Sequence, residues 1–331
     1  MSELQTPIRN IGVLTSGGDA PGMNAVIRAI VRGGLRYQYT VYGIRRGFHG
    51  LWRGDIDQLD GDSVSERLQR GGTFLMTARS NTFNTPEGVE RAIAMAQVFN
   101  LDLVITIGGD GTFRGARDLA RHGFKVIGIP ATIDNDIACT DYSIGYDTAM
   151  NTAMDAIDKL RDTAMSHERC SVIEVMGRKA GYLALNVGIS TGAEVIMIPE
   201  VKIDFQRDVI RVLLEGRNSG KHHYIVVVAE GAGSAADVAE KIETMTGIES
   251  RATILGHLQR GGSPTNRDRT MASMMGLHAI ECIHEGRLNR IIAYKSDQII
   301  DIDIEEALNM QKTIDPSELQ KASILSARRA F

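Results

Sequence analysis

Short apolar segments rich in β-branched residues alternate along this chain with longer stretches in which apolar residues recur at helical spacing. Strands of a parallel sheet are buried on both faces, and crossover connections, usually helices, must join them. The alternation therefore predicts an α/β fold with a parallel sheet covered on both faces. We expect its strands at 11–14, 41–44, 103–107, 126–129, 171–175, 195–198 and 224–228.

Two helical segments and the chain length indicate how the fold is divided. The connection between the strands at 103–107 and 126–129 is long enough for a crossover helix that stops at Gly123, which completes a β-α-β unit. Residues 148–161 carry apolar side chains at close to 3.6-residue spacing. At roughly 150 residues per domain, 331 residues predict two domains, and we place the change near residue 145.

Composition excludes several classes of protein. Lys and Arg number 37 and Asp and Glu 41, a net charge of −4, which gives no bulk reason to expect nucleic acid or a membrane as partner. Cys139, Cys170 and Cys282 lie far apart without a C-x-x-C pattern, so neither a zinc site nor a disulfide framework is expected. No signal-peptide core or membrane-length apolar run is present, and we expect a soluble, cytoplasmic protein.

A glycine-rich loop, TSGGDAPGMN at 15–24, follows the first expected strand and opens a helix over 24–36. Glycines let the backbone approach an anion, and a helix N-terminus offers N–H groups to it. The loop matches neither G-x-x-x-x-G-K-[ST] nor G-x-G-x-x-G, which argues against a dehydrogenase-type dinucleotide site. The alternative is a tight strand-to-helix turn without a ligand.

Two further strand ends carry carboxylates. GGDGT at 108–112 places Asp110 between glycines, where it can be a Mg²⁺ ligand beside a polyphosphate or a helix-capping residue. TIDND at 132–136 places Asp134 where it can act as a general base on a hydroxyl, or belong to an ordinary turn. Because ligands of open α/β sheets bind at the carboxyl ends of strands, three such loops together favour phosphoryl transfer.

The second half of the chain supplies basic residues in or beside glycine turns. They are found in EVMGR at 174–178, at Arg251 and in GHLQRGGSP at 256–264, and Glu230 accompanies them. A planar guanidinium pairs bidentately with phosphate oxygens, so these segments suit the phosphate of a second substrate. Each residue taken alone is also compatible with a solvated surface, a turn or simple packing.

Six motifs occur in a fixed order across nearly the whole chain: TSGGDAPGMN, RGGT, GGDGT, TIDND, EVMGR and GHLQRGGSP. The ordered set resembles the bacterial-type ATP-dependent 6-phosphofructokinase family. The resemblance implies a kinase that transfers the γ-phosphoryl group of Mg²⁺-bound ATP to the 1-hydroxyl of fructose 6-phosphate, the committed step of glycolysis. It also implies a homotetramer with sites between subunits.

For the fold, the resemblance implies two Rossmann-like, three-layer αβα domains with mainly parallel sheets and the active site in the cleft between them. The nucleotide- and Mg²⁺-binding domain would comprise 1–144 and 258–308. The sugar-phosphate-binding domain would comprise 145–257 and 309–331.

The family's site residues carry over position by position. The resemblance implies a nucleotide site of Gly18, Phe48, Arg79, Ser80, Asp110, Gly111, Thr112 and Gly115, with Asp110 holding Mg²⁺. It implies a sugar-phosphate site of Thr132, Ile133, Asp134, Met176, Gly177, Arg178, Glu230, His257 and Arg260, completed by Arg169 and Arg251 of a neighbouring subunit. Asp134 would be the proton acceptor, assisted in catalysis by Asp136, Thr132, Arg79 and Arg178.

Departures from the family pattern concern the phosphoryl donor. Pyrophosphate-using relatives carry Asp where this chain has Gly111, and Lys where it has Ala131. Gly111 leaves room for an α-phosphate, so ATP is favoured as donor. A pyrophosphate-dependent phosphofructokinase and a non-catalytic regulatory subunit on the same scaffold are the alternatives.

The family's effector site for ADP or phosphoenolpyruvate is present in part. Its matching residues are Arg28, Arg32, Arg161, Glu194, Lys221 and His223. Two basic positions of the pattern read Gly61 and Ser219 here. Because fewer cations remain to bind phosphate, we expect weakened inhibition by phosphoenolpyruvate.

Overall fold

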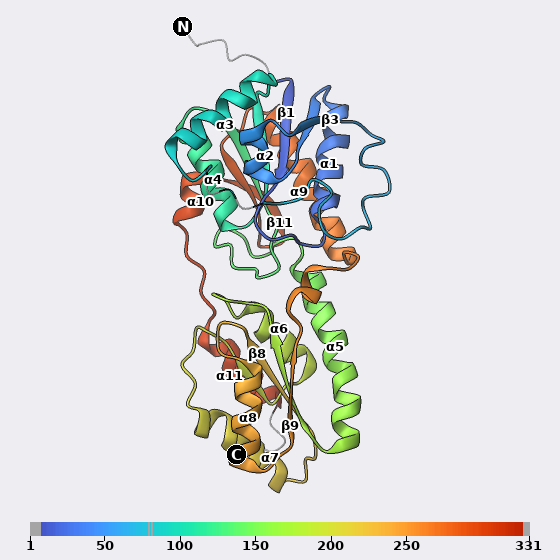
Figure 1. Ribbon diagram of the computed structural model, residues 1–331, viewed down its shortest axis with the longest axis vertical. Coiled ribbons are helices and arrows are strands. Elements are labelled where there is room, and N and C mark those ends of the chain that lie inside the picture. The colour runs from blue at the N-terminus through green and yellow to red at the C-terminus, as the bar shows by residue number, and fades with distance from the viewer. Residues whose placement is uncertain (1–7, 79, 81, 327–331) are drawn as a thin grey trace. The chain divides into compact units, whose positions relative to one another are not determined.

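The structure is a computed structural model, and it describes residues 8–78, 80 and 82–326 (Figure 1). These residues divide into two compact units, each built from separate stretches of the chain. Unit 1 contains the described residues of Met1–Ile133, Ile137–Asp147 and Arg260–Lys312. Unit 2 contains those of Asp134–Asp136, Thr148–Gln259 and Thr313–Phe331.

Unit 1 is built on a seven-stranded sheet in the order β11-β10-β5-β4-β1-β2-β3. Its five inner strands run parallel, and the two edge strands β3 and β11 pair antiparallel with β2 and β10. The strands are β1 (Asn10–Thr15), β2 (Thr40–Ile44), β3 (Ile56–Leu59), β4 (Leu103–Gly108), β5 (Lys125–Pro130), β10 (Arg290–Lys295) and β11 (Gln298–Asp303).

Helices cover both faces of this sheet (Figure 1). On one face, a core that includes Phe48, Phe113 and Leu119 joins the sheet to helices α2, α3, α4 and α10. On the other, α1 and α9 pack closely, because a side chain at Gly276 would meet the Cβ of Ala29 at 2.8 Å. The helices are α1 (Met23–Arg36), α2 (Gly47–Arg53), α3 (Pro86–Val98), α4 (Asp110–Arg121), α9 (Asn266–His284) and α10 (Ile304–Asn309).

Unit 2 contains a four-stranded parallel sheet in the order β7-β8-β6-β9. Side chains such as Val172, Val226 and Leu213 form a core between the sheet and the helices on one face. The strands are β6 (Cys170–Val175), β7 (Val195–Met197), β8 (Tyr224–Ala229) and β9 (Ser250–Ile254). The helical segments are α5 (Tyr146–His167), which starts in unit 1, α6 (Tyr182–Thr191), the π-helical η1 (Phe205–Ile210), α7 (Arg211–Asn218), α8 (Ala235–Thr246), the 3₁₀ helix η2 (Gly256–Arg260) and α11 (Pro316–Ser326).

The three-layer α/β architecture predicted from the sequence is confirmed, and each of the seven expected strands is present. The sheet of unit 1 is mixed, because its edge strands β3 and β11 pair antiparallel with their neighbours. These two strands were not predicted, and neither were the parallel strands β9 and β10. In β3 only Ile56 and Leu59 are buried, so the strand lacks the continuous apolar run by which the inner strands were recognised. The predicted helix over 148–161 is longer, Tyr146–His167.

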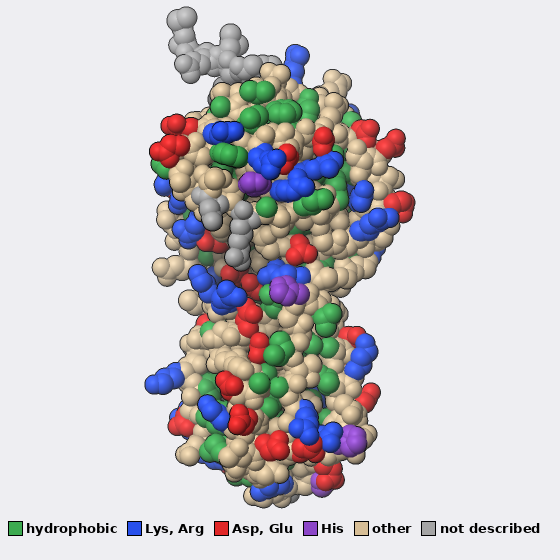
Figure 2. All heavy atoms as spheres, in the orientation of Figure 1, with side chains coloured by type: hydrophobic (Ala, Val, Ile, Leu, Met, Phe, Trp, Pro, Cys, Tyr) green, Lys and Arg blue, Asp and Glu red, His purple; other side chains and the backbone are tan. Residues whose placement is uncertain are grey.

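The surface of each unit mixes both signs of charge. Figure 2 shows Lys and Arg side chains interspersed with Asp and Glu side chains on the face it presents. Among the described residues, every helix is too short or too polar to cross a lipid bilayer.

Candidate active site

The loop that joins β1 to α1 is shaped by two glycines in the left-handed backbone region. Gly17 has φ +83° and Gly22 has φ +109°, conformations that are costly for residues with a side chain. A Cβ at Gly22 would also lie 2.6 Å from a methyl carbon of Ile144. These glycines allow the backbone to turn sharply from the strand into the helix at Met23.

Asn24, in the first turn of α1, fixes the loop at 70–74 to this turn. Its side-chain nitrogen donates to the carbonyl oxygens of Arg70 and Gly71 over 3.1 Å each, and its oxygen accepts from the N–H of Phe74 over 2.9 Å. The side chain is almost fully buried. Both segments belong to the predicted motifs, but no role was predicted for Asn24. The sequence feature that could have revealed its role is that Asn24 is a polar residue among the apolar residues that α1 buries.

The loop after β4 is packed directly against the loop after β1. A side chain at Gly108 would lie 2.3 Å from the carbonyl oxygen of Ser16, so this position has room only for glycine. Thr112 donates from its hydroxyl to that same oxygen over 3.1 Å. The N–H of Ser16 donates to the carbonyl oxygen of Ile107 over 3.0 Å. Two of the predicted phosphate-binding loops therefore form one bonded structure.

Asp110, the predicted Mg²⁺ ligand, is the first residue of α4, and its side chain is about half exposed, at 49%. One carboxylate oxygen accepts from Nε of Arg114 over 2.8 Å, and no described residue bonds to the second oxygen. Apart from the adjacent backbone of α4, no heavy atom of the described residues lies within 4 Å of where a Cβ of Gly111 would be. An exposed carboxylate beside open space fits Mg²⁺, which usually binds one or two carboxylates together with substrate phosphates and water.

The remaining residues of the expected nucleotide site differ in exposure. Phe48 is mostly buried and stacks on Phe83 with ring centroids 4.2 Å apart. A Cβ at Gly115 would lie 2.7 Å from the Phe48 ring, so Gly115 permits this packing. The hydroxyl of Ser80 accepts from the N–H of Phe83 over 3.2 Å. Arg79 lies outside the described residues.

The loop after β5 carries the expected general base. Gly108 and Pro130 are register partners of β4 and β5, and the N–H of Ala131 donates to the carbonyl oxygen of Gly108 over 3.0 Å. The hydroxyl of Ser143 donates to the carbonyl oxygen of Thr132 over 2.7 Å. The start of this loop is therefore bonded to the loop that carries Asp110.

The backbone continues from Thr132 through the buried Ile133 to the two aspartates. Asn135 adopts φ +51°, a left-handed conformation that Asn tolerates better than most residues. Asp134 is half-buried, whereas Asp136 is exposed. The bend at Asn135 separates two carboxylates of different exposure.

A buried carboxylate supports the chain that follows this loop. Asp268, fully buried in α9, accepts from the hydroxyl of Tyr142 over 2.5 Å and from the N–H of Gly145 over 2.7 Å. Burial and the neighbouring Asp268 carboxylate raise the pKa of Tyr142. The phenol therefore stays protonated and remains a donor to Asp268.

Arg260, expected at the sugar phosphate, lies on the β1–α1 loop of unit 1. Its Nη1 donates to the carbonyl oxygen of Asp19 over 3.1 Å and would lie 2.3 Å from a Cβ at Gly18. The hydroxyl of Ser263 donates to the carbonyl oxygen of Gln69 over 2.7 Å. The glycine turn after η2 therefore packs against the loops at 15–24 and 70–74.

In unit 2, the segment EVMGR lies at the end of β6. The N–H of Met176 donates to the side-chain oxygen of the fully buried Gln259 over 2.8 Å. Gly177 has φ +129°, and a Cβ there would lie 2.5 Å from the carbonyl oxygen of Ala180.

Two expected phosphate contacts at this end of unit 2 are open to solvent. Arg178 is 82% exposed, and its Nε lies 3.7 Å from a carboxylate oxygen of Glu230. His257, in η2, is also exposed. A guanidinium so loosely held can pair with a ligand phosphate without breaking a buried interaction.

Arg169 and Arg251 both pair with the carboxylate of Glu249, a residue for which no role was predicted from the sequence. Glu249 binds Nε of Arg169 over 2.8 Å through one oxygen and Nη2 of Arg251 over 2.6 Å through the other. The hydrogen bond from Arg169 holds the pKa of Glu249 below its ordinary value. The structure thus joins the two arginines expected to serve a neighbouring subunit.

The expected effector residues fall in both units. Arg28 and Arg32 lie one turn apart on α1, and burial together with Arg32 lowers the pKa of Arg28. In unit 2, Lys221 forms an ion pair with the nearly buried Glu194, and Arg161 donates to the carbonyl oxygen of Thr191. His223, the sixth of the expected effector residues, also belongs to unit 2.

Within the described chain, one other group has metal-binding side chains. His278, Cys282 and Asp301 offer ligand atoms within 4.8 Å of one another. Asp301, however, is already paired with Arg290 over 2.7 Å and with Arg287. Burial raises the pKa of Cys282 to about 11, and two guanidiniums beside the carboxylate oppose a further cation. These ion pairs instead connect β11 to β10 and to the loop that follows α9.

Comparisons of the sequence and of the structure with known proteins identify the family. The family model described as phosphofructokinase matches residues 10–283. The ATP-dependent 6-phosphofructokinase of Clostridium tetani is 52% identical over 319 residues, which cover 96% of this chain and 100% of the relative. ATP-dependent 6-phosphofructokinase 1 of Clostridium perfringens is 50% identical with the same coverage.

A solved structure of phosphofructokinase from Saccharomyces cerevisiae has a TM-score of 0.86 at 32% identity and covers 96% of this chain and 48% of the yeast chain. This chain thus spans about half the length of that yeast chain. The family match extends over most of the sequence and includes each of the loops described above. This chain belongs to the phosphofructokinase family.

Proposed function

We propose that this protein transfers the γ-phosphoryl group of ATP to the 1-hydroxyl of fructose 6-phosphate, giving fructose 1,6-bisphosphate and ADP. One observation carries the proposal. The pairing of Gly108 with Pro130 sets the loop of Asp110 beside the loop that leads to Asp134. A metal-binding carboxylate and a base are the two acidic groups that kinase chemistry needs. The names of relatives about 50% identical along almost the whole chain support the same reaction.

Unit 1 binds the nucleotide in this proposal. The loops at Gly18 and Gly108–Thr112 allow close approach of the phosphates, and the N-terminus of α4 offers N–H groups to them. The open space at Gly111 accommodates the α-phosphate. Ser80, Gly115, the edge of Phe48 and Arg79 complete the proposed nucleotide contacts. Asp110 would hold Mg²⁺, which supplies charge neutralisation on the β- and γ-phosphates when bound.

The chain's own residues perform the transfer. Asp134 takes the proton of the 1-hydroxyl as that oxygen forms its bond to the γ-phosphorus and the bond to the ADP oxygen breaks. Asp136 and the backbone at Thr132 hold Asp134 in position. Arg178 is free enough to pair with the transferring group, whose negative charge spreads over its oxygens in a loose transition state.

Fructose 6-phosphate is bound mainly by unit 2. The proposed contacts of the sugar and its phosphate in unit 2 are Met176, Gly177, Glu230 and His257. Ile133 and Arg260 of unit 1 complete them. Arg169 and Arg251 would bind the phosphate of a neighbouring subunit's substrate, in a homotetramer. If so, dilution to monomers abolishes activity, and full activity in separated subunits contradicts this assignment.

The donor is tested by a coupled assay of fructose 1,6-bisphosphate formation with fructose 6-phosphate and Mg²⁺. One reaction receives ATP and the other pyrophosphate. We expect turnover with ATP alone. Turnover with pyrophosphate would show that Gly111 does not select the donor, and turnover with neither would favour a regulatory subunit.

Regulation and location complete the proposal. ADP or phosphoenolpyruvate would bind at Arg28, Arg32, Arg161, Glu194, Lys221 and His223. Sigmoidal saturation by fructose 6-phosphate that ADP relieves supports this site, whereas hyperbolic curves unaffected by either effector contradict it.

A cytoplasmic location suits the three free, buried cysteines, because thiols persist in reducing compartments.

A further inference from the structure

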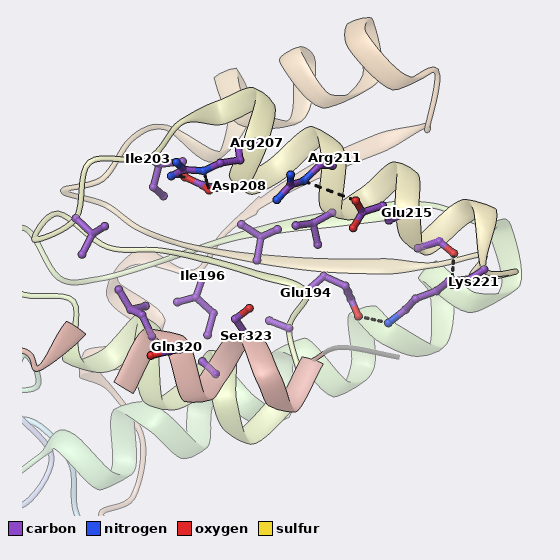
Figure 3. Close-up of a pocket in the computed structure, with 18 of the residues that line it drawn as sticks. Glu194, Ile196, Ile203, Arg207, Asp208, Arg211, Glu215, Lys221, Gln320 and Ser323 are labelled. Carbon is purple, nitrogen blue, oxygen red and sulfur yellow. Dashed lines mark hydrogen bonds and ion pairs between the residues drawn. The ribbon is translucent and has the colours of Figure 1, made fainter. Parts of the chain in front are cut away.

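Unit 2 contains a cavity of about 670 Å³ that takes no part in the proposed reaction (Figure 3). Edge strand β7 forms one wall, the helical segments η1 and α7 form a second, and α11 forms a third. Its volume lies within the range of small-molecule sites, about 300–1,000 Å³. The π-helical turn η1 borders it, and such turns occur frequently at functional sites.

The interior of this cavity is largely apolar. Ile196 of β7 and Val212 of α7 contribute to opposite walls, and Ile203, Leu319 and Ala322 extend the apolar lining. Figure 3 shows Ile196 and Ile203 extending into the space between α7 and α11. An occupant with an apolar body would therefore remove hydrocarbon surface from water, which favours binding.

Charged side chains at the cavity are mostly paired with one another. Arg207 makes two hydrogen bonds to Asp208, over 2.6 and 3.0 Å, and Arg211 lies 3.6 Å from Glu215. Four basic and three acidic residues line the cavity, so one positive charge is in excess. Lys202 is exposed and has no hydrogen-bond or ion-pair partner within the part of the chain that the structure describes.

We propose that this cavity binds a small molecule with an apolar body and a single anionic group. The apolar lining would hold the body, and Lys202 would pair with the anion because it is the cation without an acidic partner among the described residues. An exposed Arg211, only loosely paired with Glu215, is close enough in the same lining to contribute.

This site overlaps the expected effector site only in part. The two share Glu194 and Lys221, which form an ion pair at one end of the cavity (Figure 3), and Ser219, which stands at a basic position of the effector pattern. Arg161 and His223 do not line the cavity, and neither do Arg28 and Arg32. A nucleotide or a phosphorylated acid requires several unpaired cations, whereas this lining offers one in excess.

The test uses two fluorescent probes that differ in one group. 8-Anilinonaphthalene-1-sulfonate carries an apolar body and one anion, and N-phenyl-1-naphthylamine is the same body without the sulfonate. Titrated into the full-length protein, the anionic probe should saturate at one site per chain. Lys202→Gln should weaken its binding by about 2- to 5-fold, the range of an exposed ion pair, and leave the neutral probe unaffected.

Occlusion of the cavity should abolish binding of both probes. Val212→Trp places a large side chain in the lining, and Ile203→Trp does so from another segment, so one variant remains informative if the other misfolds. We expect at least about a 10-fold loss of affinity, equivalent to about 1.4 kcal/mol. Met245→Trp on α8, outside the cavity, and Lys159→Gln on α5 are the matched controls and should bind as the wild type does.

Three results would overturn the proposal. Absence of saturable binding to the wild type excludes the site. Unchanged affinity in a folded Val212→Trp or Ile203→Trp protein places the probe elsewhere. Equal loss of both probes in Lys202→Gln shows that Lys202 does not recognise the anion.

Discussion

The hydroxyl of Thr112 donates to the carbonyl oxygen of Ser16 over 3.1 Å, and this bond ties the start of α4 to the loop after β1. Thr112 is 3% exposed, so little water is available to replace the bond. The two loops lie 96 residues apart in the sequence but act as one phosphate-binding structure in our proposal. Their spacing therefore depends on a single buried hydroxyl together with the backbone bond from Ser16 to Ile107.

Thr112→Val keeps the shape of the side chain but removes this donor. We expect a loss of about 1–3 kcal/mol of folding free energy, because the partly buried Ser16 carbonyl loses a hydrogen-bond partner. The kcat/KM for ATP should fall more than that for fructose 6-phosphate. Urea unfolding and steady-state kinetics measure both, with Thr112→Ser, which keeps the hydroxyl, as control. A valine variant with unchanged KM and kcat would show that the bond does not position the loop.

Gly111 and Gly115 lie one turn apart on α4. A side chain added at Gly111 should change the kinetics with ATP, whereas one added at Gly115 should lower stability. In Gly111→Asp the new Cβ meets no described atom within 4 Å beyond the adjacent backbone of α4, so thermal stability should remain near that of the wild type. The added charge should repel the α-phosphate and lower kcat/KM for ATP. Gly115→Ala would place a carbon 2.7 Å from Phe48 and should cost about 1–3 kcal/mol through overpacking. Calorimetry and ATP kinetics distinguish the two effects. Equal ATP kinetics in Gly111→Asp would contradict the donor assignment.

Asp134→Ser removes the proposed base but retains a small polar side chain. We expect kcat to fall by about 10²–10⁴-fold, the usual contribution of a general base, with little change in affinity for fructose 6-phosphate. Steady-state kinetics with both substrates varied measure this, and Asp155→Ser on α5 is the control for loss of an exposed aspartate. A kcat near that of the wild type would exclude Asp134 as the base.

Tyr142→Phe removes the phenol that donates to the buried Asp268 carboxylate over 2.5 Å. Because the carboxylate keeps its bond to the N–H of Gly145 but loses a close donor, we expect a loss of about 1–3 kcal/mol in unfolding free energy. Tyr39→Phe, which removes a phenol that is only partly buried, is the control and should change stability by less than about 0.5 kcal/mol. Equal effects of the two substitutions would mean that the buried bond adds no stability.

The buried thiols predict a fall in stability at alkaline pH. Burial raises the pKa of Cys139 and Cys282 to about 11 and that of Cys170 to about 12, from an ordinary 9.0. Above pH 9 the unfolded chain therefore binds fewer protons than the folded one, and the free energy of unfolding decreases until the folded thiols ionise. Below pH 9 this contribution is constant.

Urea unfolding between pH 8 and pH 10.5 measures this slope, and Cys282→Ala should reduce it. A thiol reagent should react slowly with the native protein at pH 8 and rapidly in denaturant, because buried thiols are inaccessible and protonated. Rapid modification of the native protein would contradict the burial of all three cysteines.

The sequence by itself determined the fold class. The inner strands β1, β4 and β5 are buried on both faces and therefore read as uninterrupted apolar runs, which made them easy to predict. The motifs were also readable in the sequence, because several glycine- and carboxylate-containing segments follow directly after expected strands in one fixed order, whereas a single such segment also fits a turn or a helix cap. Strands β3, β9, β10 and β11 were not predicted. The edge strands β3, β9 and β11 are only partly buried and carry polar residues, and β10 has a buried run of only three residues.

Only the tertiary structure decided which of these residues contact one another. Asn24 with the loop at 70–74, Arg260 over Gly18, and Glu249 between Arg169 and Arg251 are contacts between segments or side chains that local patterning does not pair. The cavity between β7, α7 and α11 has the same origin. The apolar periodicity of a segment indicates which of its faces is buried. Hydrogen bonds between distant loops and the space left between helices depend instead on how all the segments pack together.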